Sequence, residues 1–433
     1  MQEVAPVIAI VGVIVFSAHL FTGIFSRTRI PDVLFLITIG ICLGPILGLV
    51  TPIQFGKVGP VFTTITLIII LFECGTTLKL STLRSALGGA LELSMLTFII
   101  TIPTVAGLIL WLTELELLPA FIFAAIVGST AEAIVIPLIR QLKMREDSQT
   151  ILSIESSVTT VLSIILAITL IEAYRVGEFQ VIPATGNLLS SFLVAVVLGI
   201  VGACAWSIVI NKIRSVKNTM FTTPAFVFVI FGVVEILGFN GAIAALAFGI
   251  TMGNIEPIHS VLFEKHSGNK YASFTEMEKV FFSEVAFLLK TFFFVYLGIS
   301  LEFISTRLMI LALILVIIAF FLRIFTVKVS INKLIPLKDA SIMAIMIPRG
   351  LTAVVLASIP LQQGIIGGEL IRNLTYGVVL VSILATSILV FLLAKTKLSA
   401  FYGTVLTNRG LTPLIQGILH VCGYRRALPR IEN

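Results

Sequence analysis

Several ionisable side chains lie inside apolar stretches of this sequence, where a charge is costly and usually functional. They include the carboxylates of Glu132 and Glu155 and the cations of Arg349 and Lys290. A desolvated carboxylate beside a cation can hold either a proton or a metal ion. Hydroxyl groups, whose oxygen atoms suit hard cations, stand on the same segments: Ser129, Thr130, Ser156, Ser157, Thr159, Thr160 and Thr352. The pattern is that of a site where protons and metal ions compete.

Each of these residues also has a purely structural interpretation. Glu155 would form an ion pair with Arg349 that merely holds two helices together, and Glu132 would pack against the positive N-terminal end of a half-helix. Arg349, which does not titrate usefully, is expected to be structural. Lys290 also has a functional interpretation, as a counter-charge or a proton carrier. Threonine hydroxyls can bond the carbonyl four residues earlier. We favour an interfacial position for three carboxylates nearer to span ends: Glu73, Glu92 and Glu235.

The composition places these residues in a membrane. Of the 433 residues, 58% are hydrophobic and 12% are charged, and the mean hydropathy is +1.13. Soluble domains carry about 25% charged residues, and apolar stretches long enough to cross a bilayer recur here from end to end. We expect an all-α membrane protein with about thirteen transmembrane helices, at residues 4–24, 31–50, 60–78, 86–112, 118–139, 150–173, 187–211, 219–237, 240–253, 280–301, 308–327, 339–361 and 374–394.

Basic residues alternate between the predicted loops. Most of the 29 Lys and Arg residues lie in loops that follow odd-numbered spans, and few lie in loops that follow even-numbered ones. The positive-inside rule then predicts a multi-pass cell-membrane protein with its N-terminus outside and its C-terminus in the cytoplasm. These loops explain the formal net charge of +7, so we do not expect a nucleic-acid partner.

Two of the spans are interrupted at matching places. The fifth contains GSTAEA at residues 128–133, and the twelfth contains IPRGLT at residues 347–352. If residues 187–211 form a linker helix, each is the fifth member of a six-helix unit, and the two units are inverted. Matching interruptions indicate a transport site where the broken helices cross at the midplane. We predict one transmembrane unit, with repeats at 4–173 and 219–394 and a cytoplasmic tail at 395–433.

Several segments resemble the monovalent cation/proton antiporter superfamily, which includes sodium/proton exchangers and potassium-efflux antiporters. The similarity lies in TRIPDV at 28–33, GICLGP at 40–45, LFECG at 71–75, GFNGAIAALAFG at 238–249 and FFFVYLGISL at 292–301. The resemblance implies a homodimer whose mobile core contains the crossed broken helices 5 and 12. It also implies elevator-type alternating access and exchange of Na⁺, K⁺ or Li⁺ for H⁺, with no resident cofactor.

The sequence departs from this superfamily at the ion site. Many members carry Thr-Asp-Pro at the first break, where this chain has Thr130, Ala131 and Glu132. Glu155 matches the superfamily's glutamate on the sixth helix, but Thr160 replaces the aspartate that binds the ion. A threonine cannot hold a proton and a cation in turn, so we expect Glu132 or Glu155 to have taken over.

The expected ion and proton site therefore comprises Glu155, Glu132, Thr130, Thr159, Thr160 and Ser156. Arg349, which matches the superfamily's arginine on helix 12, and Lys290 supply supporting charges. Glu155 and Thr130 are the expected direct ligands of the alkali cation.

Other functions stay open at this point. Loss of two carboxylates with both cations retained would suit an anion or organic acid carried on the same scaffold. A transport-inactive sensor is a second alternative, and an antiporter locked by engineered changes at Thr160 or Ala131 is a third. An enzyme is not expected, because the sequence contains no nucleophile–base pair, no metal-ligand cluster and no Walker-type phosphate loop.

Overall fold

A computed structural model describes residues 9, 12–21, 23, 31–50, 58–78, 89–176, 183–214, 220–255, 273–301, 305–331 and 335–395. The regular elements in these ranges are all helical, as the sequence predicts. Parts of the first span, most of the loop between the ninth and tenth spans, and the tail after residue 395 lie outside the described residues.

The helices follow the predicted order of spans. Residues 12–21 are helical, and the later elements are α2 (Asp32–Ile41) with a π-helical extension η1 (Cys42–Ile46), α3 (Val58–Thr77), α5 (Gly89–Leu112), α6 (Leu117–Ile126), α7 (Glu132–Gln141), α8 (Glu146–Val176), α9 (Pro183–Ile213), α10 (Thr222–Ile236), α11 (Gly241–Gly253), α13 (Glu276–Ser300), α14 (Thr306–Ser330), α15 (Leu337–Ile345), α16 (Leu351–Gln362) and α17 (Gly368–Lys395). Six described helices are long and apolar enough to cross a membrane by themselves: α5, α8, α9, α13, α14 and α17.

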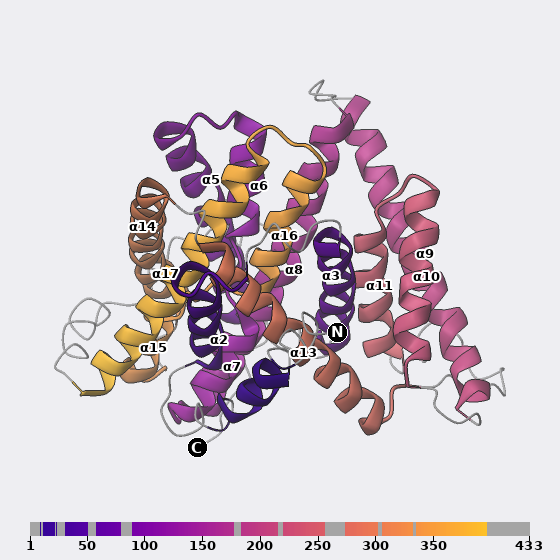
Figure 1. The fold of residues 1–433 in the computed structure, drawn as a ribbon, viewed down its shortest axis with the longest axis horizontal. Helices are drawn as coiled ribbons and strands as arrows, with labels where there is room; N and C mark the ends of the chain where they lie inside the picture. Colours follow the sequence, from indigo (N-terminus) through magenta and orange to yellow (C-terminus); the bar gives the residue numbers. More distant parts are fainter. Residues whose placement is uncertain are drawn as a thin grey trace, which may run out of the picture.

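The fifth and twelfth spans are each split into two half-helices, as predicted. Residues 127–131 separate α6 from α7, and residues 346–350 separate α15 from α16. In Figure 1 the halves α6 and α16 lie in the upper part of the molecule, and α7 and α15 lie in the lower part. The two broken spans therefore run in opposite directions, which is the arrangement of an inverted repeat.

The predicted turn between the eighth and ninth spans is also present. Gly238 has a φ of +82°, a left-handed conformation that glycine adopts without steric cost. The Asn240 side chain then caps α11 by accepting a hydrogen bond from the Ile243 amide at 3.1 Å. This cap satisfies an amide that the first turn of the helix leaves unpaired.

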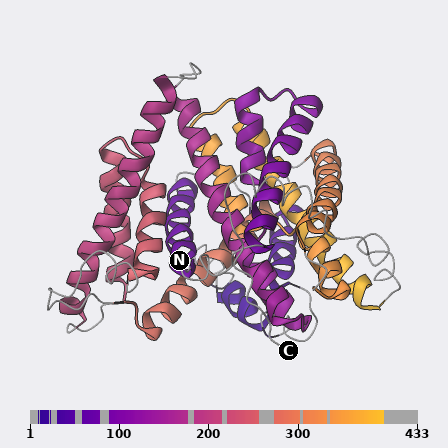
Figure 2. The ribbon, with the colours of Figure 1, turned by 180° about the vertical axis from the view of Figure 1, so that it is seen from behind.

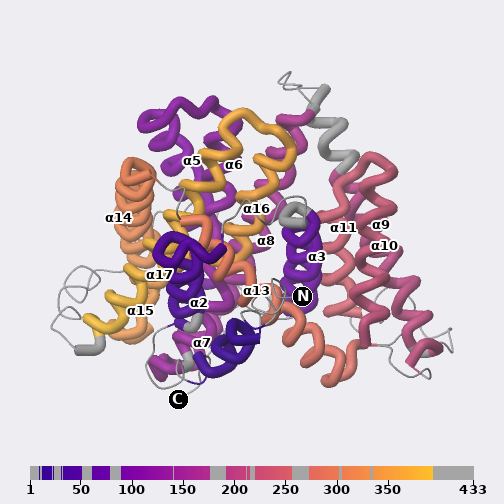
Figure 3. The backbone as a smooth tube through the Cα atoms, in the orientation of Figure 1, coloured from indigo at the N-terminus to yellow at the C-terminus, as the bar shows by residue number. Residues whose placement is uncertain are grey.

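The helices form two groups. Helices α9, α10 and α11 lie together at the right of Figure 1 with α3 beside them, and α5, α6, α14, α16 and α17 lie to the left. The view from behind in Figure 2 shows the same separation. The tube in Figure 3 shows that α3, from the start of the chain, lies beside α11, from its second half. Each group therefore combines helices from both predicted repeats.

Paired glycines allow close helix contacts at two related places. A Cβ atom on Gly249 of α11 would meet the Phe72 carbonyl of α3 and lie 3.2 Å from the Gly75 Cα. A Cβ atom on Gly298 of α13 would meet the Ile37 carbonyl of α2 and lie 2.8 Å from the Gly40 Cα. Small residues let membrane helices approach closely. The third span thus contacts the ninth, and the tenth contacts the second. In the two predicted repeats the third span corresponds to the tenth and the second to the ninth, so the two contacts are equivalent.

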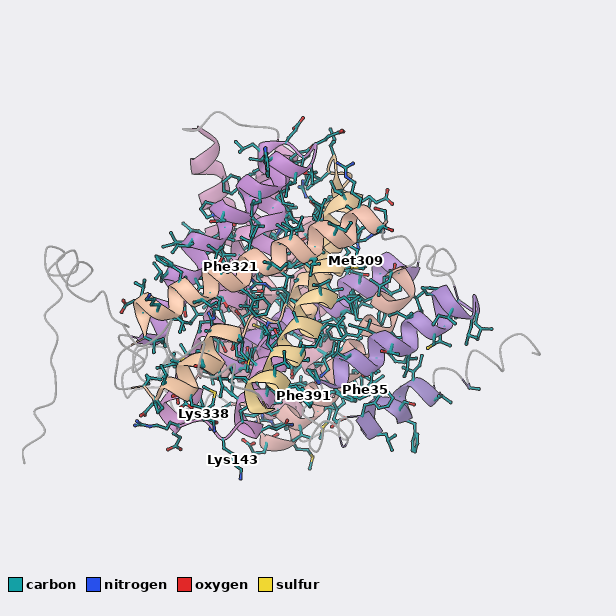
Figure 4. The ribbon with its side chains drawn as sticks, turned by 90° about the vertical axis from the view of Figure 1, so that its left-hand side faces the viewer. Phe35, Lys143, Met309, Phe321, Lys338 and Phe391 are labelled. Atoms are coloured by element: carbon teal, nitrogen blue, oxygen red, sulfur yellow. The ribbon has the colours of Figure 1, made fainter. Side chains whose placement is uncertain are left out.

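Large apolar side chains cover the outer face of α14. Figure 4 shows Met309 and Phe321 on the face that it turns to the viewer. Phe321 is 68% exposed, and Ile310, Leu313, Ile317 and Phe325 of the same helix are also exposed. Such a surface is unfavourable in water and suits contact with lipid.

The glycine contact between α2 and α13 predicts a large effect of a single methyl group. Gly298→Ala should destabilise the protein by about 1–3 kcal/mol, because the added carbon has no space between two backbones. The measurement is thermal unfolding in detergent. Gly107→Ala on α5 is the matched control, because a Cβ atom there meets nothing within 4 Å. Equal melting temperatures for the two variants would contradict the close contact.

Candidate functional site

The two helix breaks bind each other. The Ala131 amide in the first break donates a hydrogen bond to the Pro348 carbonyl in the second at 2.7 Å. The Arg349 guanidinium, whose residue is only 4% exposed, donates through Nη1 to the Ser129 carbonyl at 2.5 Å. Non-helical backbone inside a membrane needs such partners, since lipid offers none. Arg349 is therefore a structural tie between the breaks, as expected from the sequence.

Glu155 forms a buried two-pronged ion pair, but its partner is Arg323 of α14. Nη1 and Nη2 of Arg323 lie 3.0 and 3.1 Å from Oε1 and Oε2 of Glu155. The two side chains are 1% and 0% exposed. The alternative that paired Glu155 with Arg349 is wrong, because Arg349 points to the Ser129 carbonyl instead. Arg323 also stands as a charge within a predicted span, a signal that could have identified it in the sequence.

Further hydrogen bonds extend this ion pair to neighbouring helices. The Thr130 hydroxyl donates to Glu155 Oε1 at 3.2 Å, and Arg323 Nε donates to the Met343 carbonyl at 3.0 Å. Arg323 Nη1 also reaches the Thr97 hydroxyl at 3.4 Å. Both carboxylate oxygens of Glu155 are thus engaged by protein groups, which leaves Glu155 poorly placed to bind a cation.

Most of the predicted hydroxyl residues gather around the first break. The Thr130 amide donates to the Thr159 hydroxyl at 3.4 Å, and the Thr160 hydroxyl donates to the Thr130 carbonyl at 3.3 Å. Ser156 behaves differently, since its hydroxyl donates to the Ser153 carbonyl of its own helix at 3.0 Å. The structure therefore brings Thr130, Thr159 and Thr160 together at the break and leaves Ser156 bonded within α8.

A cavity of about 370 Å³ lies where the first break meets α3 and α13. Its charged lining residues are Glu132, Glu73 and Lys290. Its polar and small lining residues at the breaks include Ser129, Ala131, Thr160, Gly350 and Thr352. Neither Glu155 nor Arg349 is among the residues that line it. Some residues of the predicted site, such as Glu132 and Thr160, therefore line the cavity, whereas Glu155 and Arg349 do not.

Glu132 is the first residue of α7, at the positive end of a half-helix dipole. The Ser157 side chain of α8 lies near the Glu132 carboxylate, and its hydroxyl donates to the Ser153 carbonyl at 3.0 Å. The residue is half-buried and lines the cavity. Both interpretations offered for Glu132 by the sequence are therefore compatible with its position, since it lies at a half-helix N-terminus and also in the cavity.

Glu73 lies in the cavity, and our interpretation of it as an interfacial carboxylate is wrong. It stands one turn before the end of α3, close enough to Lys290 and Glu132 for electrostatic interaction. Nearness to a helix end was misleading, because the end of α3 packs toward the first break. Glu235 does lie at an exposed helix end, where it accepts a hydrogen bond from the Gly241 amide at 2.7 Å.

Lys290 of α13 supplies the positive charge of the cavity. Its Nζ lies 5.3 Å from the ring centroid of Phe287, which also lines the cavity. In the part of the chain that the structure describes, no cluster of three or more His, Cys, Asp or Glu residues could hold a metal ion. The charged groups of the cavity are therefore two carboxylates and one ammonium, drawn from three helices.

An inverted pair of crossed broken helices around a charged cavity defines a secondary transporter fold. The sequence profile of the family described as sodium/hydrogen exchanger, transmembrane, matches residues 13–395. The chain belongs to this family of transporters, which are not enzymes.

Two curated relatives agree with this family membership. The K⁺/H⁺ antiporter NhaP2 of Shewanella sp. (strain MR-4) is 26% identical over 389 residues, covering 84% of this chain and 62% of that protein. NhaP2 of Shewanella oneidensis is 25% identical over 392 residues, with the same coverage. The chain thus spans 62% of the length of these curated relatives.

A solved structure confirms the fold. The sodium proton antiporter MjNhaP1 of Methanocaldococcus jannaschii, in its structure at pH 8, superposes with a TM-score of 0.69 at 20% sequence identity. The match covers 89% of this chain and all of that one. The multi-span fold predicted from the sequence is therefore the fold of this chain.

The buried ion pair predicts unequal costs for single and double substitutions. Glu155→Gln or Arg323→Gln alone should each destabilise the protein by about 3–5 kcal/mol, because the remaining charge is buried without its partner. The double variant should be less destabilised than the sum of the two. Thermal unfolding in detergent measures all three, and strictly additive losses would contradict direct pairing.

Proposed function

We propose that this chain exchanges a monovalent cation, Na⁺, K⁺ or Li⁺, for protons across the cell membrane. The observation that carries this proposal is the cavity at the crossed helix breaks, with two carboxylates and one ammonium in its lining. The names of the NhaP2 and MjNhaP1 relatives point to the same exchange, although the NhaP2 proteins are longer than this chain.

Glu132 is the carboxylate that we assign to the exchange. Competition between a proton and a cation requires a carboxylate that can hold either. Glu155 is paired with Arg323. Thr160, which the resemblance matches to the superfamily's aspartate, has only a hydroxyl group. Glu132 is half-buried and lines the cavity, so its carboxylate can be reached from that space. Thr160 and Ser129 line the same cavity and offer neutral oxygen atoms to a cation.

The charge of the cavity favours a cation over an anion. With Glu73 and Glu132 ionised and Lys290 protonated, the three groups carry one net negative charge, which a single monovalent cation neutralises. The guanidinium groups of Arg349 and Arg323 are tied to a carbonyl and to a carboxylate, outside the cavity lining. The anion carrier considered from the sequence therefore has no support in the position of Arg349.

The position of the cavity suits an elevator-type mechanism. Glu73 and Lys290 come from α3 and α13, whereas Glu132 and Thr160 come from α7 and α8. The lining residues of α3, α7 and α13 lie on the side of the breaks that the charge pattern predicts to be cytoplasmic. Sliding of α7, α8 and α16 past α3 and α13 would carry Glu132 toward the other side, and this motion is part of the proposal.

The assembly is also proposed from the resemblance. We propose a homodimer in the cell membrane, with a cytoplasmic C-terminus and no resident cofactor beyond the transported ions. Cross-linking and native mass spectrometry of the purified protein would test the dimer.

Proton flux in proteoliposomes tests the proposed exchange. Vesicles containing a pH dye receive Na⁺, Li⁺, K⁺ or Cl⁻ gradients, with the unchanged protein or Glu132→Gln. We expect cation-driven proton movement that Glu132→Gln lowers at least a hundredfold, because the amide cannot take up a proton. Glu235→Gln, an exposed carboxylate outside the cavity, is the matched control and should stay within twofold.

Other results would contradict specific parts of this proposal. Full activity of Glu132→Gln would exclude Glu132 as the exchanged carboxylate. Proton movement driven by Cl⁻ alone would favour an anion carrier. No ion-coupled movement, from protein that is folded by its thermal unfolding profile, would leave a sensor as the better interpretation.

A further inference from the structure

Phe287 of α13 is one of the side chains that surround the cavity. It is half-buried and lines the cavity, and the Lys290 Nζ lies 5.3 Å from its ring centroid. A cation within about 6 Å of an aromatic ring face is attracted to it. Lys290 also interacts electrostatically with Glu73. The interactions of the ammonium in the cavity therefore include one with an aromatic ring and one with a carboxylate.

The helix at residues 12–21 holds the other side of this ring. The His19 imidazole packs edge-on against Phe287, with ring centroids 4.8 Å apart at an interplanar angle of 69°. His19 Nε2 also lies 3.9 Å from Oε2 of Glu284, one turn before Phe287 on α13. His19 of the first helix thus contacts the Phe287 ring directly and also lies near Glu284 on the same helix as that ring.

A lysine in a cation site is a competitor of the cargo. Its ammonium sits on a flexible four-carbon stem, and it carries the same single charge as an alkali ion. If it moved fully onto Glu73 and Glu132, it would neutralise the carboxylates that the cargo needs. The aromatic face offers the ammonium a favourable position that leaves both carboxylates available.

We propose that Phe287 is a positioning residue: its ring attracts the Lys290 ammonium and so leaves Glu73 and Glu132 available to the cargo cation. This inference rests on the proposed cation/proton exchange. The proposed role requires an aromatic ring at position 287 and a cation at position 290. In this proposal the first helix helps to keep the ring in place through the contact of His19 with Phe287.

Cation-dependent proton flux of Phe287 variants in proteoliposomes tests this role. Phe287→Leu should raise the KM for the cation about fivefold, the factor that corresponds to about 1 kcal/mol of lost cation–π interaction. The kcat should stay within twofold, because the exchanged carboxylate is intact. Phe287→Tyr keeps an aromatic face and should restore a KM close to that of the unchanged protein. Phe281→Leu, which removes a ring of α13 outside the cavity lining, is the matched control.

Repeating the Phe287→Leu measurement in a Lys290→Gln protein distinguishes an effect on the position of Lys290 from a general effect on packing. Lys290→Gln should lower the KM, since the tethered competitor is gone, and adding Phe287→Leu should then change the KM by less than twofold. An equal rise of the KM in both backgrounds, or an unchanged KM for Phe287→Leu alone, would overturn the proposal while leaving the exchange intact. Absence of cation-coupled flux in the unchanged protein would instead overturn the proposed function and this inference together.

Discussion

Backbone groups at an interrupted helix must find partners inside the membrane, and the centre of this protein is organised by that requirement. The two breaks satisfy each other directly, through the amide of Ala131 with the carbonyl of Pro348 and the guanidinium of Arg349 with the carbonyl of Ser129. Neither break is complete alone. Gly350 belongs to the same arrangement, because a Cβ atom there would lie 2.6 Å from the Ala131 Cβ. The crossing therefore depends on a small residue at each of these positions.

The Glu155–Arg323 pair fastens this crossing to the surrounding helices. It joins α8 to α14, reaches the end of α15 through the Met343 carbonyl, and accepts the Thr130 hydroxyl of the first break. Removing two charges from water costs free energy, so a buried ion pair is weak evidence of stability. The Glu155–Arg323 pair instead requires α8 and α14 to lie in one defined arrangement. Glu155 is engaged by these groups and does not line the cavity, whereas Glu73 and Glu132 do.

The cavity takes its charged residues from a broken helix and from the neighbouring helices α3 and α13. Glu132 and Thr160 belong to the elements of the breaks, whereas Glu73, Lys290 and Phe287 belong to α3 and α13. The close glycine contacts anchor α3 on α11 and α13 on α2. A site whose lining comes from both the broken helices and their neighbours is the feature on which the proposed elevator-type exchange rests.

Local patterns in the sequence predicted much of this architecture. Hydropathy located the spans, and clusters of Gly, Pro and polar residues located the two breaks and the turn at Gly238. These features depend on a residue and its near neighbours, since an apolar stretch must be helical in lipid and an interruption needs residues that tolerate it. The motifs shared with cation/proton antiporters added the family, which the match over residues 13–395 confirms.

The partners of the charged residues were decided only by the tertiary structure. Glu155 and Arg323 are 168 positions apart, and no local pattern distinguishes Arg323 from Arg349 as the partner. Glu73 has the sequence context of a helix end, yet the packing of α3 places it in the cavity with Glu132 and Lys290. The sequence by itself determined which segments cross the membrane and where they break. Which side chains meet at the breaks depended on which helices pack together, because electrostatic and hydrogen-bond partners are selected by distance in space.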